Sequence, residues 1–297
     1  MPGDEPAPSG TSVPYARYVA LGDSQTEGLG DGDDVTGLRG WADRLAEHLA
    51  AANPRLEYAN LAVRGRLAGQ VRAEQLAPAL AMRPDLVTVV AGVNDLMRPK
   101  FDVVEVVGHL EAMFAALAAT GARVVTVTFP DIGVIAPLAR PLRPRVYALN
   151  AGIRAAAARH GAAVVETAAH AFAVDPRIWT ADRLHLSSLG HERFAAAAHA
   201  VLLPGADDAW TRPLPPQAAP AGWRAAKAEL RWVAAHLGPW LGRRLRGRSS
   251  GDGRTAKRPQ LVAVGAVGLP VRPPVRPPVR PPESPAVRPR PPAGEAT

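Results

Sequence analysis

Ser24, Asp182 and His185 are the residues whose types and spacing could carry out nucleophilic catalysis. Ser24 lies in a Gly-Asp-Ser turn that ends a short apolar run at residues 18–22, which would hold its hydroxyl at the end of a strand. Asp182 and His185 are three positions apart, so one loop can present an imidazole to Ser24 and a carboxylate to the other ring nitrogen. The chain order Ser, Asp, His is one of several that catalytic triads use. Taken singly, each residue could equally be a helix cap, a turn residue or a surface histidine.

A serine that attacks a carbonyl group also needs hydrogen-bond donors for the oxyanion that forms. Gly65 ends the segment NLAVRG, and a glycine lets its backbone N–H approach a substrate closely because it has no Cβ. Asn94, in the segment GVND, supplies an amide donor, and the backbone N–H of Ser24 is the third candidate. Asp23 and Asp95 are expected to make supporting hydrogen bonds beside these donors.

The elements that must position these residues are five short apolar runs that alternate with helical patterns. The expected strands are residues 18–22, 56–63, 85–92, 123–129 and 162–166, and the expected helices are residues 41–52, 69–81, 102–120, 143–160 and 187–203. Such alternation predicts a three-layer α/β/α fold with a parallel five-stranded sheet, here in the flavodoxin-like order 2-1-3-4-5. In this order the carboxyl ends of strands 2, 1 and 3 are neighbours, so Gly65 and Asn94 would flank Ser24 on one rim.

Four segments of the chain together resemble the four signature blocks of the SGNH (GDSL-like) hydrolases: GDSQTEG, NLAVRG, GVND and DRLHLS. The resemblance covers about residues 15–203. It implies an esterase, lipase, thioesterase or carbohydrate deacetylase that needs no metal and no cofactor. It also implies that Ser24 is the nucleophile, His185 the base and Asp182 the residue that orients it. The N–H groups of Ser24 and Gly65 would form the oxyanion hole with Asn94. Gln25 stands where the family's common name has leucine.

Charge and composition divide the chain into unlike parts. Residues 1–203 carry 19 basic and 21 acidic residues, a net charge of −2, whereas residues 204–297 carry 16 and 6, a net charge of +10. We expect five parts: a disordered N-terminus at 1–14, the catalytic domain at 15–203, a Pro/Ala linker at 204–221, a basic helical appendage at 222–248 and a low-complexity Pro/Arg-rich tail at 249–297. The appendage is expected to form two helices. The first carries an apolar stripe that would face the catalytic domain, formed by Trp223, Ala226, Leu230, Val233 and Leu237. Pro239 opens the second.

Several classes of protein are disfavoured. The absence of cysteine excludes disulfides, thiolate catalysis and cysteine metal sites. No apolar run approaches the roughly 18 residues of a membrane span, and the polar, Pro-rich start does not resemble a signal peptide, so a cytoplasmic protein is expected. No motif indicates nucleic-acid binding. Residues 28–34 lack the spacing of a calcium loop, and His191 is interpreted as a helix-face residue that helps to position the loop, not as a metal ligand.

The sequence therefore predicts a serine hydrolase that cleaves a small-molecule carboxylic ester through an acyl-enzyme on Ser24. The acyl pocket would be shaped by the loops at 28–40, 97–102 and 130–144, the last of which could form an apolar wall or belong to the core. The alternative is an adaptor protein with a vestigial hydrolase site, whose residues 222–297 make weak contacts with an anionic membrane surface.

Overall fold

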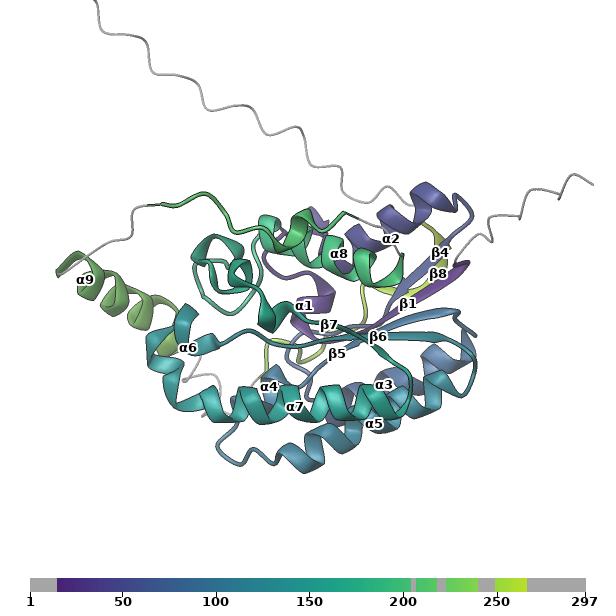
Figure 1. Cartoon of the computed structure of the whole chain (residues 1–297), viewed down its shortest axis with the longest axis horizontal. Coiled ribbons are helices and arrows are strands. Elements are labelled where there is room, and N and C mark those ends of the chain that lie inside the picture. The colour runs from purple at the N-terminus through teal and green to yellow at the C-terminus, as the bar shows by residue number, and fades with distance from the viewer. Residues whose placement is uncertain (1–14, 204–206, 218–222, 240–248, 266–297) are drawn as a thin grey trace, which may run out of the picture.

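A six-stranded sheet forms the centre of the computed structural model, which describes residues 15–203, 207–217, 223–239 and 249–265. The strands are β1 (Arg17–Gly22), β4 (Glu57–Asn60), β5 (Leu86–Val90), β6 (Arg123–Val127), β7 (Ala163–Val165) and β8 (Arg258–Ala263). They lie in the order β7-β6-β5-β1-β4-β8, and the first five are parallel (Figure 1). The predicted α/β fold and the predicted order of its five parallel strands are confirmed.

The sixth strand corrects two expectations. β8 pairs antiparallel with β4, with Tyr58 opposite Val262, so the sheet has six strands rather than the five that were predicted. The prediction of a low-complexity tail over residues 249–297 is wrong for residues 249–265, which fold onto the catalytic domain. Without β8, β4 would be an exposed edge of the sheet, and exposed edges attract another strand because their backbone groups are unpaired. Residues 266–297 and 1–14, for which disorder was expected, lie outside the described residues.

Helices cover both faces of the sheet. One face carries α2 (Trp41–Ala52) and α8 (Ser188–Leu202), and the other carries α3 (Ala68–Ala81), α5 (Val103–Ala118) and α7 (Arg143–Arg159), as Figure 1 shows. These five helices begin and end within two residues of the expected positions. Shorter elements lie in the loops: α1 (Ser24–Glu27), α4 (Val93–Leu96), α6 (Ile132–Ile135) and five 3-10 turns, Pro137–Leu142, Thr167–Ala169, Ala171–Val174, Pro176–Ile178 and Ala209–Thr211.

The longer helices follow from capping and apolar periodicity. In α5 the side chain of Asp102 caps the first turn by accepting hydrogen bonds from the backbone N–H groups of Val104 and Glu105. The residues that α5 buries recur at intervals of three and four: Val106, Leu110, Met113, Phe114 and Leu117. The five parallel strands are almost wholly buried between the two helical layers, which is why β1, β5, β6 and β7 are rich in apolar residues.

The C-terminal appendage comprises two described segments beyond the catalytic domain, residues 223–239 and 249–265. It begins with α9 (Trp223–Trp232), which continues as a π-helical turn at Val233–Leu237. The expected stripe was to face the catalytic domain, but Leu230 of that stripe is 72% exposed. Val233 of the stripe is half-buried, and Glu229 and Trp232 contact the catalytic domain, so the face turned inward lies to one side of the expected stripe. The second expected helix falls on residues 240–248, outside the described part of the chain. None of the described helices is long and apolar enough to cross a membrane.

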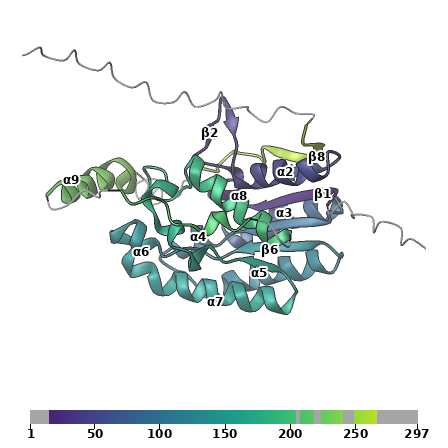
Figure 2. The ribbon, with the colours of Figure 1, turned by 45° about the horizontal axis from the view of Figure 1, so that its top comes forward.

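A small hairpin, β2 (Gly32–Asp33) and β3 (Gly37–Leu38), projects from the loop between α1 and α2. Figure 2 shows β2 standing away from the main sheet, on the same side as α2 and β8. The loop that carries this hairpin begins directly after α1, so the base of the hairpin lies near the end of β1 and Ser24.

Candidate active site

Ser24 is the first residue of α1, directly after the central strand β1. The strand ends at Gly22, where a Cβ would stand 2.5 Å from the carbonyl oxygen of Val90 on the neighbouring strand. Asp23 caps α1, because its side chain accepts a hydrogen bond from the backbone N–H of Gln25 at 3.3 Å. The tight passage from strand to helix therefore places Ser24 at the carboxyl end of the sheet, the edge at which α/β proteins build their sites.

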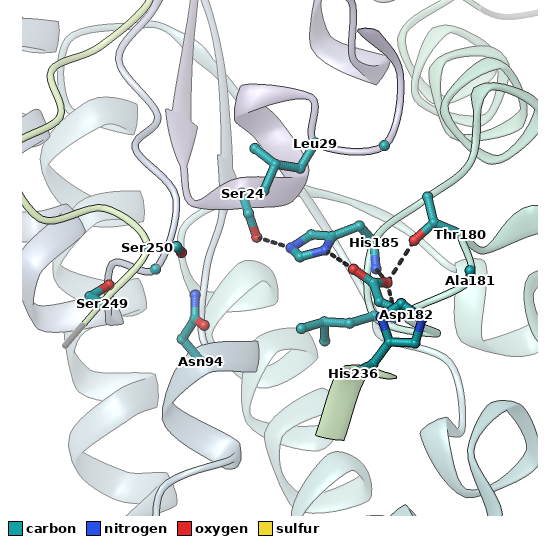
Figure 3. A pocket seen from close by; sticks show the side chains of 13 residues that line it. Ser24, Leu29, Asn94, Thr180, Ala181, Asp182, His185, His236, Ser249 and Ser250 are labelled. Carbon is teal, nitrogen blue, oxygen red and sulfur yellow. Dashed lines mark hydrogen bonds and ion pairs between the residues drawn. The ribbon is translucent and has the colours of Figure 1, made fainter. Parts of the chain in front are cut away.

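His185 and Asp182 meet Ser24 in a continuous relay (Figure 3). His185 Nε2 lies 3.0 Å from Ser24 Oγ, and His185 Nδ1 lies 2.7 Å from Asp182 Oδ2. Both distances are within hydrogen-bonding range. The structure thus brings together the three residues that were predicted to form a triad, although 158 positions separate Ser24 from Asp182 in the chain.

The environment of Asp182 favours its ionised form. Burial alone would raise the pKa of Asp182, but the hydrogen bond and the charge of His185, together with the Thr180 hydroxyl, hold the pKa of this carboxyl well below its usual range. Its second oxygen, Oδ1, accepts hydrogen bonds from Thr180 Oγ1 at 2.6 Å and from the backbone N–H groups of Leu184 and His185. A carboxylate held in this way fixes the tautomer of the histidine and stabilises the imidazolium that forms when the serine loses its proton.

Gln25 joins the nucleophile segment to the histidine loop, a role that the sequence did not reveal. Its Nε2 donates to the carbonyl of Leu184 at 2.6 Å, and its Oε1 accepts from the backbone N–H of Leu186 at 3.3 Å. The side chain therefore holds the residues on either side of His185. Its position next to Ser24 is the one signal that could have drawn attention to it.

Gly65 and Asn94 lie beside Ser24, as expected for oxyanion donors, and all three line the same cavity. Gly65 has a φ of +78°, a conformation that glycine adopts readily and that other residues disfavour. The Asn94 amide nitrogen donates to Asp23 Oδ2 at 2.9 Å and to the carbonyl of Arg66 at 3.1 Å. Both of its hydrogens are thus engaged, so an oxyanion would have to share or displace one of these acceptors.

The two supporting aspartates are buried, and burial raises the pKa of both. The pKa of Asp23 rises to about 7, because desolvation outweighs the hydrogen bonds from Gln25 and Asn94. The pKa of Asp95 is also raised by desolvation, although its carboxylate accepts a hydrogen bond from the backbone N–H of Ala68 at 3.0 Å. Asp23 orients Asn94, and Asp95 ties α4 to the start of α3.

A buried ion pair supports the oxyanion side of the site. Glu27 accepts from the backbone N–H of Arg64 at 2.6 Å and pairs with its guanidinium at 2.7 Å, next to Gly65 in the chain. Arg64 also pairs with Asp34 of the hairpin loop at 2.8 Å. The side chains of Glu27 and Arg64 are only 6% and 10% exposed, so the pair is shielded from solvent.

His191 lies at the base of the site as a buried structural residue. Its Nδ1 accepts from the backbone N–H of Trp41 at 3.0 Å, and its Nε2 donates to the carbonyl of Leu29 at 2.9 Å. Burial lowers the pKa of His191 to about 4, so the ring is neutral at physiological pH. It holds Leu29, which lines the cavity, in agreement with the role predicted for it in positioning the loop. In the described part of the chain no group of three or more His, Asp or Glu side chains is arranged to hold a metal ion.

A cavity of about 480 Å³ surrounds Ser24 Oγ. Besides the residues already named, it is lined by three side chains from the C-terminal appendage: His236, Ser249 and Ser250 (Figure 3). The sequence offered no signal for these three, because they are far from the motifs and reach the site only through the path of the appendage.

A second, narrow cavity of about 40 Å³ lies next to the site and shares Leu184 with the first. Its walls are mostly apolar and include Phe129, Pro130 and Ile132. The loop at 130–144 therefore contributes part of an apolar wall, as one of its two interpretations proposed. Val134 and Leu138 of the same loop are instead more than half exposed.

Comparison with known proteins places this site in a family. A model described as the GDSL-like Lipase/Acylhydrolase family matches residues 20–193, which include Ser24, Gly65, Asn94, Asp182 and His185. The chain belongs to this family. Its members are hydrolases by description, and the resemblance noted in the sequence is confirmed. A search of curated protein sequences found no match.

Solved structures of several hydrolases share the fold. An α/β hydrolase from the metagenome of Lake Arreo, Spain, is 25% identical, with a TM-score of 0.54 over 63% of this chain and 94% of its own. A lipase/acylhydrolase from Enterococcus faecalis is 24% identical, with a TM-score of 0.51 over 68% and 100% of the two chains. An acetylxylan esterase from Geobacillus stearothermophilus is 20% identical, with a TM-score of 0.53 over 66% and 96%. About a third of this GDSL-like chain thus has no counterpart in these three structures.

Proposed function

We propose that this protein hydrolyses carboxylic esters through an acyl-enzyme on Ser24. The observation that carries the proposal is the relay from Ser24 Oγ to His185 Nε2 at 3.0 Å and from His185 Nδ1 to Asp182 Oδ2 at 2.7 Å. A vestigial site would have no need to keep this relay, so the geometry favours an enzyme over the adaptor alternative.

The proposed reaction has two steps. Ser24 Oγ attacks the ester carbonyl while His185 Nε2 takes its proton, and the imidazolium then returns that proton to the departing alkoxide. The oxyanion of each tetrahedral intermediate would be stabilised by the N–H groups of Ser24 and Gly65 and by the Asn94 amide. In the second step His185 activates water, which attacks the acyl group and releases Ser24.

The shape of the site supports a short acyl group. The main cavity combines the apolar side chains of Leu29 and Leu184 with hydroxyl, amide and imidazole groups from Thr180, Asn94, His236, Ser249 and Ser250. The apolar cavity next to it measures about 40 Å³, far below the roughly 300–1,000 Å³ of ligand pockets. The enclosed apolar cavity is thus too small for a long acyl chain, so we propose acetate and butyrate esters as the preferred class.

The proposal is tested by hydrolysis of p-nitrophenyl esters from acetate to palmitate, with wild type and Ser24→Ala side by side. We expect kcat/KM to be highest for the two shortest esters and turnover to disappear in Ser24→Ala. A fluorophosphonate probe should label wild type at Ser24 and leave the variant unlabelled. Turnover retained in Ser24→Ala would refute the assignment of the nucleophile, and a preference for palmitate would refute the short acyl group alone.

A further inference from the structure

The C-terminal appendage approaches the site from outside the part that the GDSL-like family shares. The match to the family ends at residue 193, yet α9, which begins at Trp223, contacts the loop that carries Asp182 and His185. This loop holds two of the three residues of the relay, so its shape determines whether His185 can reach Ser24.

The contacts converge on two residues of the loop. Trp232 Nε1 donates a hydrogen bond to the backbone carbonyl of Asp182 at 3.2 Å. The guanidinium of Arg183 lies 4.9 Å from the centre of the Trp232 ring, a cation–π contact. The same guanidinium pairs with Glu229, one turn earlier on α9, at 2.7 Å. The helix α9 thus contacts both the backbone of the loop, at Asp182, and a side chain of the loop, that of Arg183.

The loop contains a strained backbone conformation that these contacts can stabilise. Arg183 has a φ of +59°, a left-handed conformation that costs energy for a residue other than glycine. Arg183 stands between Asp182 and His185, so relaxation of its backbone would change the angle between carboxylate and imidazole. The inner side of the loop is held by Gln25, whose hydrogen bonds go to the backbone of Leu184 and Leu186.

We propose that α9 is a clamp on the catalytic loop and that Trp232 is a positioning residue for the Asp182–His185 pair. Trp232 holds the Asp182 carbonyl from outside and, with Glu229, holds Arg183 in its left-handed turn. The appendage would then be part of the catalytic machinery of this chain. The inference rests on the proposed function, because it assigns to Trp232 an effect on that reaction.

The test compares Trp232→Ala and Trp232→Phe with Leu230→Ala in the full-length protein. Leu230 lies on the same helix, is 72% exposed and serves as the matched control. Because a misplacement of about 1 Å can cost up to about 10²-fold in rate, we expect kcat on p-nitrophenyl acetate to fall about tenfold in Trp232→Ala with KM nearly unchanged. Trp232→Phe keeps a ring for Arg183 and loses the N–H donor, so it should recover part of that loss. Leu230→Ala should match wild type.

A spectroscopic measurement separates positioning from simple stability. The His185 Nδ1 proton, hydrogen-bonded to Asp182, should give a far-downfield ¹H NMR signal in wild type and Leu230→Ala. We expect the signal to broaden or move upfield in Trp232→Ala at a temperature at which circular dichroism shows a folded protein. An unchanged signal, or equal kcat in the two alanine variants, would overturn the clamp. If wild type lacks both ester turnover and fluorophosphonate labelling, the proposed function fails, whereas the NMR comparison still decides the clamp.

Discussion

Ser249 Oγ occupies the space in which a side chain on Gly65 would begin. A Cβ built on Gly65 would lie 2.2 Å from this oxygen, far inside van der Waals contact. Gly65 is the proposed oxyanion donor and lies in the family core, whereas Ser249 belongs to the appendage. The two residues are therefore in close contact although 184 positions separate them in the chain, and the appendage is packed against the candidate site.

Gly65→Ala should damage catalysis more than folding. The alanine would clash with Ser249 and would strain a backbone with a φ of +78°, which would displace the Gly65 N–H from the oxyanion. Because removal of one oxyanion donor typically costs about 10²–10³-fold, we expect kcat/KM on p-nitrophenyl acetate to fall by about 10²-fold. Gly121→Ala is the control, since Gly121 has a φ of +85° but nothing within 4 Å of its Cβ position. Equal activity in both variants would contradict the role of Gly65.

Gln25→Ala should lower kcat while leaving substrate binding nearly intact. The substitution removes both hydrogen bonds that hold the residues flanking His185. Since the base would then sample positions away from Ser24, a loss of about tenfold in kcat is expected. Gln70→Ala, which removes an exposed cap of α3, provides a comparison in steady-state kinetics. An effect no larger than that of Gln70→Ala would mean that the histidine loop holds its shape without Gln25.

Asp23 should make the protein less stable as the pH rises. Its pKa lies at about 7 in the folded protein against 3.8 for an ordinary aspartate, so the folded state binds more protons between these two pH values. Stability from this group therefore falls as the pH rises from about 4 through about 7, by up to roughly 4 kcal/mol at 1.36 kcal/mol per unit. Asp23→Asn removes the titration and keeps an acceptor for Asn94. In urea unfolding at pH 5 and pH 8, the free energy of unfolding of Asp23→Asn relative to that of wild type should be higher at pH 8 than at pH 5. A difference that does not depend on pH would exclude this role of Asp23.

Lys257 should be the main anchor of the appendage, and Arg254 a minor one. Lys257 Nζ lies 2.5 Å from Asp43 Oδ2, and the Asp43 side chain is 1% exposed. Lys257→Ala leaves a buried carboxylate without its cation, which typically costs about 3–5 kcal/mol. Arg254→Ala breaks a pair with Asp34 in which both side chains are well exposed, at 40% and 51%, so a much smaller loss of stability is expected. Urea denaturation of both variants tests the difference, and hydrogen exchange should show loss of protection in β8 for Lys257→Ala only. Equal losses in the free energy of unfolding in the two variants would refute the prediction that Lys257 is the main anchor.

Local sequence was sufficient for most of the fold. Apolar periodicity located the five parallel strands and the five long helices, because the spacing of buried residues is set by the geometry of each element. Right-handed crossovers left few topologies for the parallel strands, and the flavodoxin-like order chosen among them is the order observed. The residues at the strand ends, Ser24, Gly65 and Asn94, were then predicted to meet because parallel strands share one carboxyl edge.

Only the tertiary structure decided how the appendage is used. The pattern of residues 222–237 indicated an amphipathic helix but not which face turns inward, and the inward face proved to hold Glu229 and Trp232 rather than Leu230. Nothing in residues 258–263 specified the edge of β4, because the choice of a strand's partner depends on which distant edge is left unpaired. The sequence by itself thus determined the five parallel strands, the five long helices and the candidate residues at the strand ends, because these depend on local spacing and on the shared edge of a parallel sheet. The contacts of Gln25, Trp232 and Ser249 with the site depend on long-range packing, and local spacing carries no information about that.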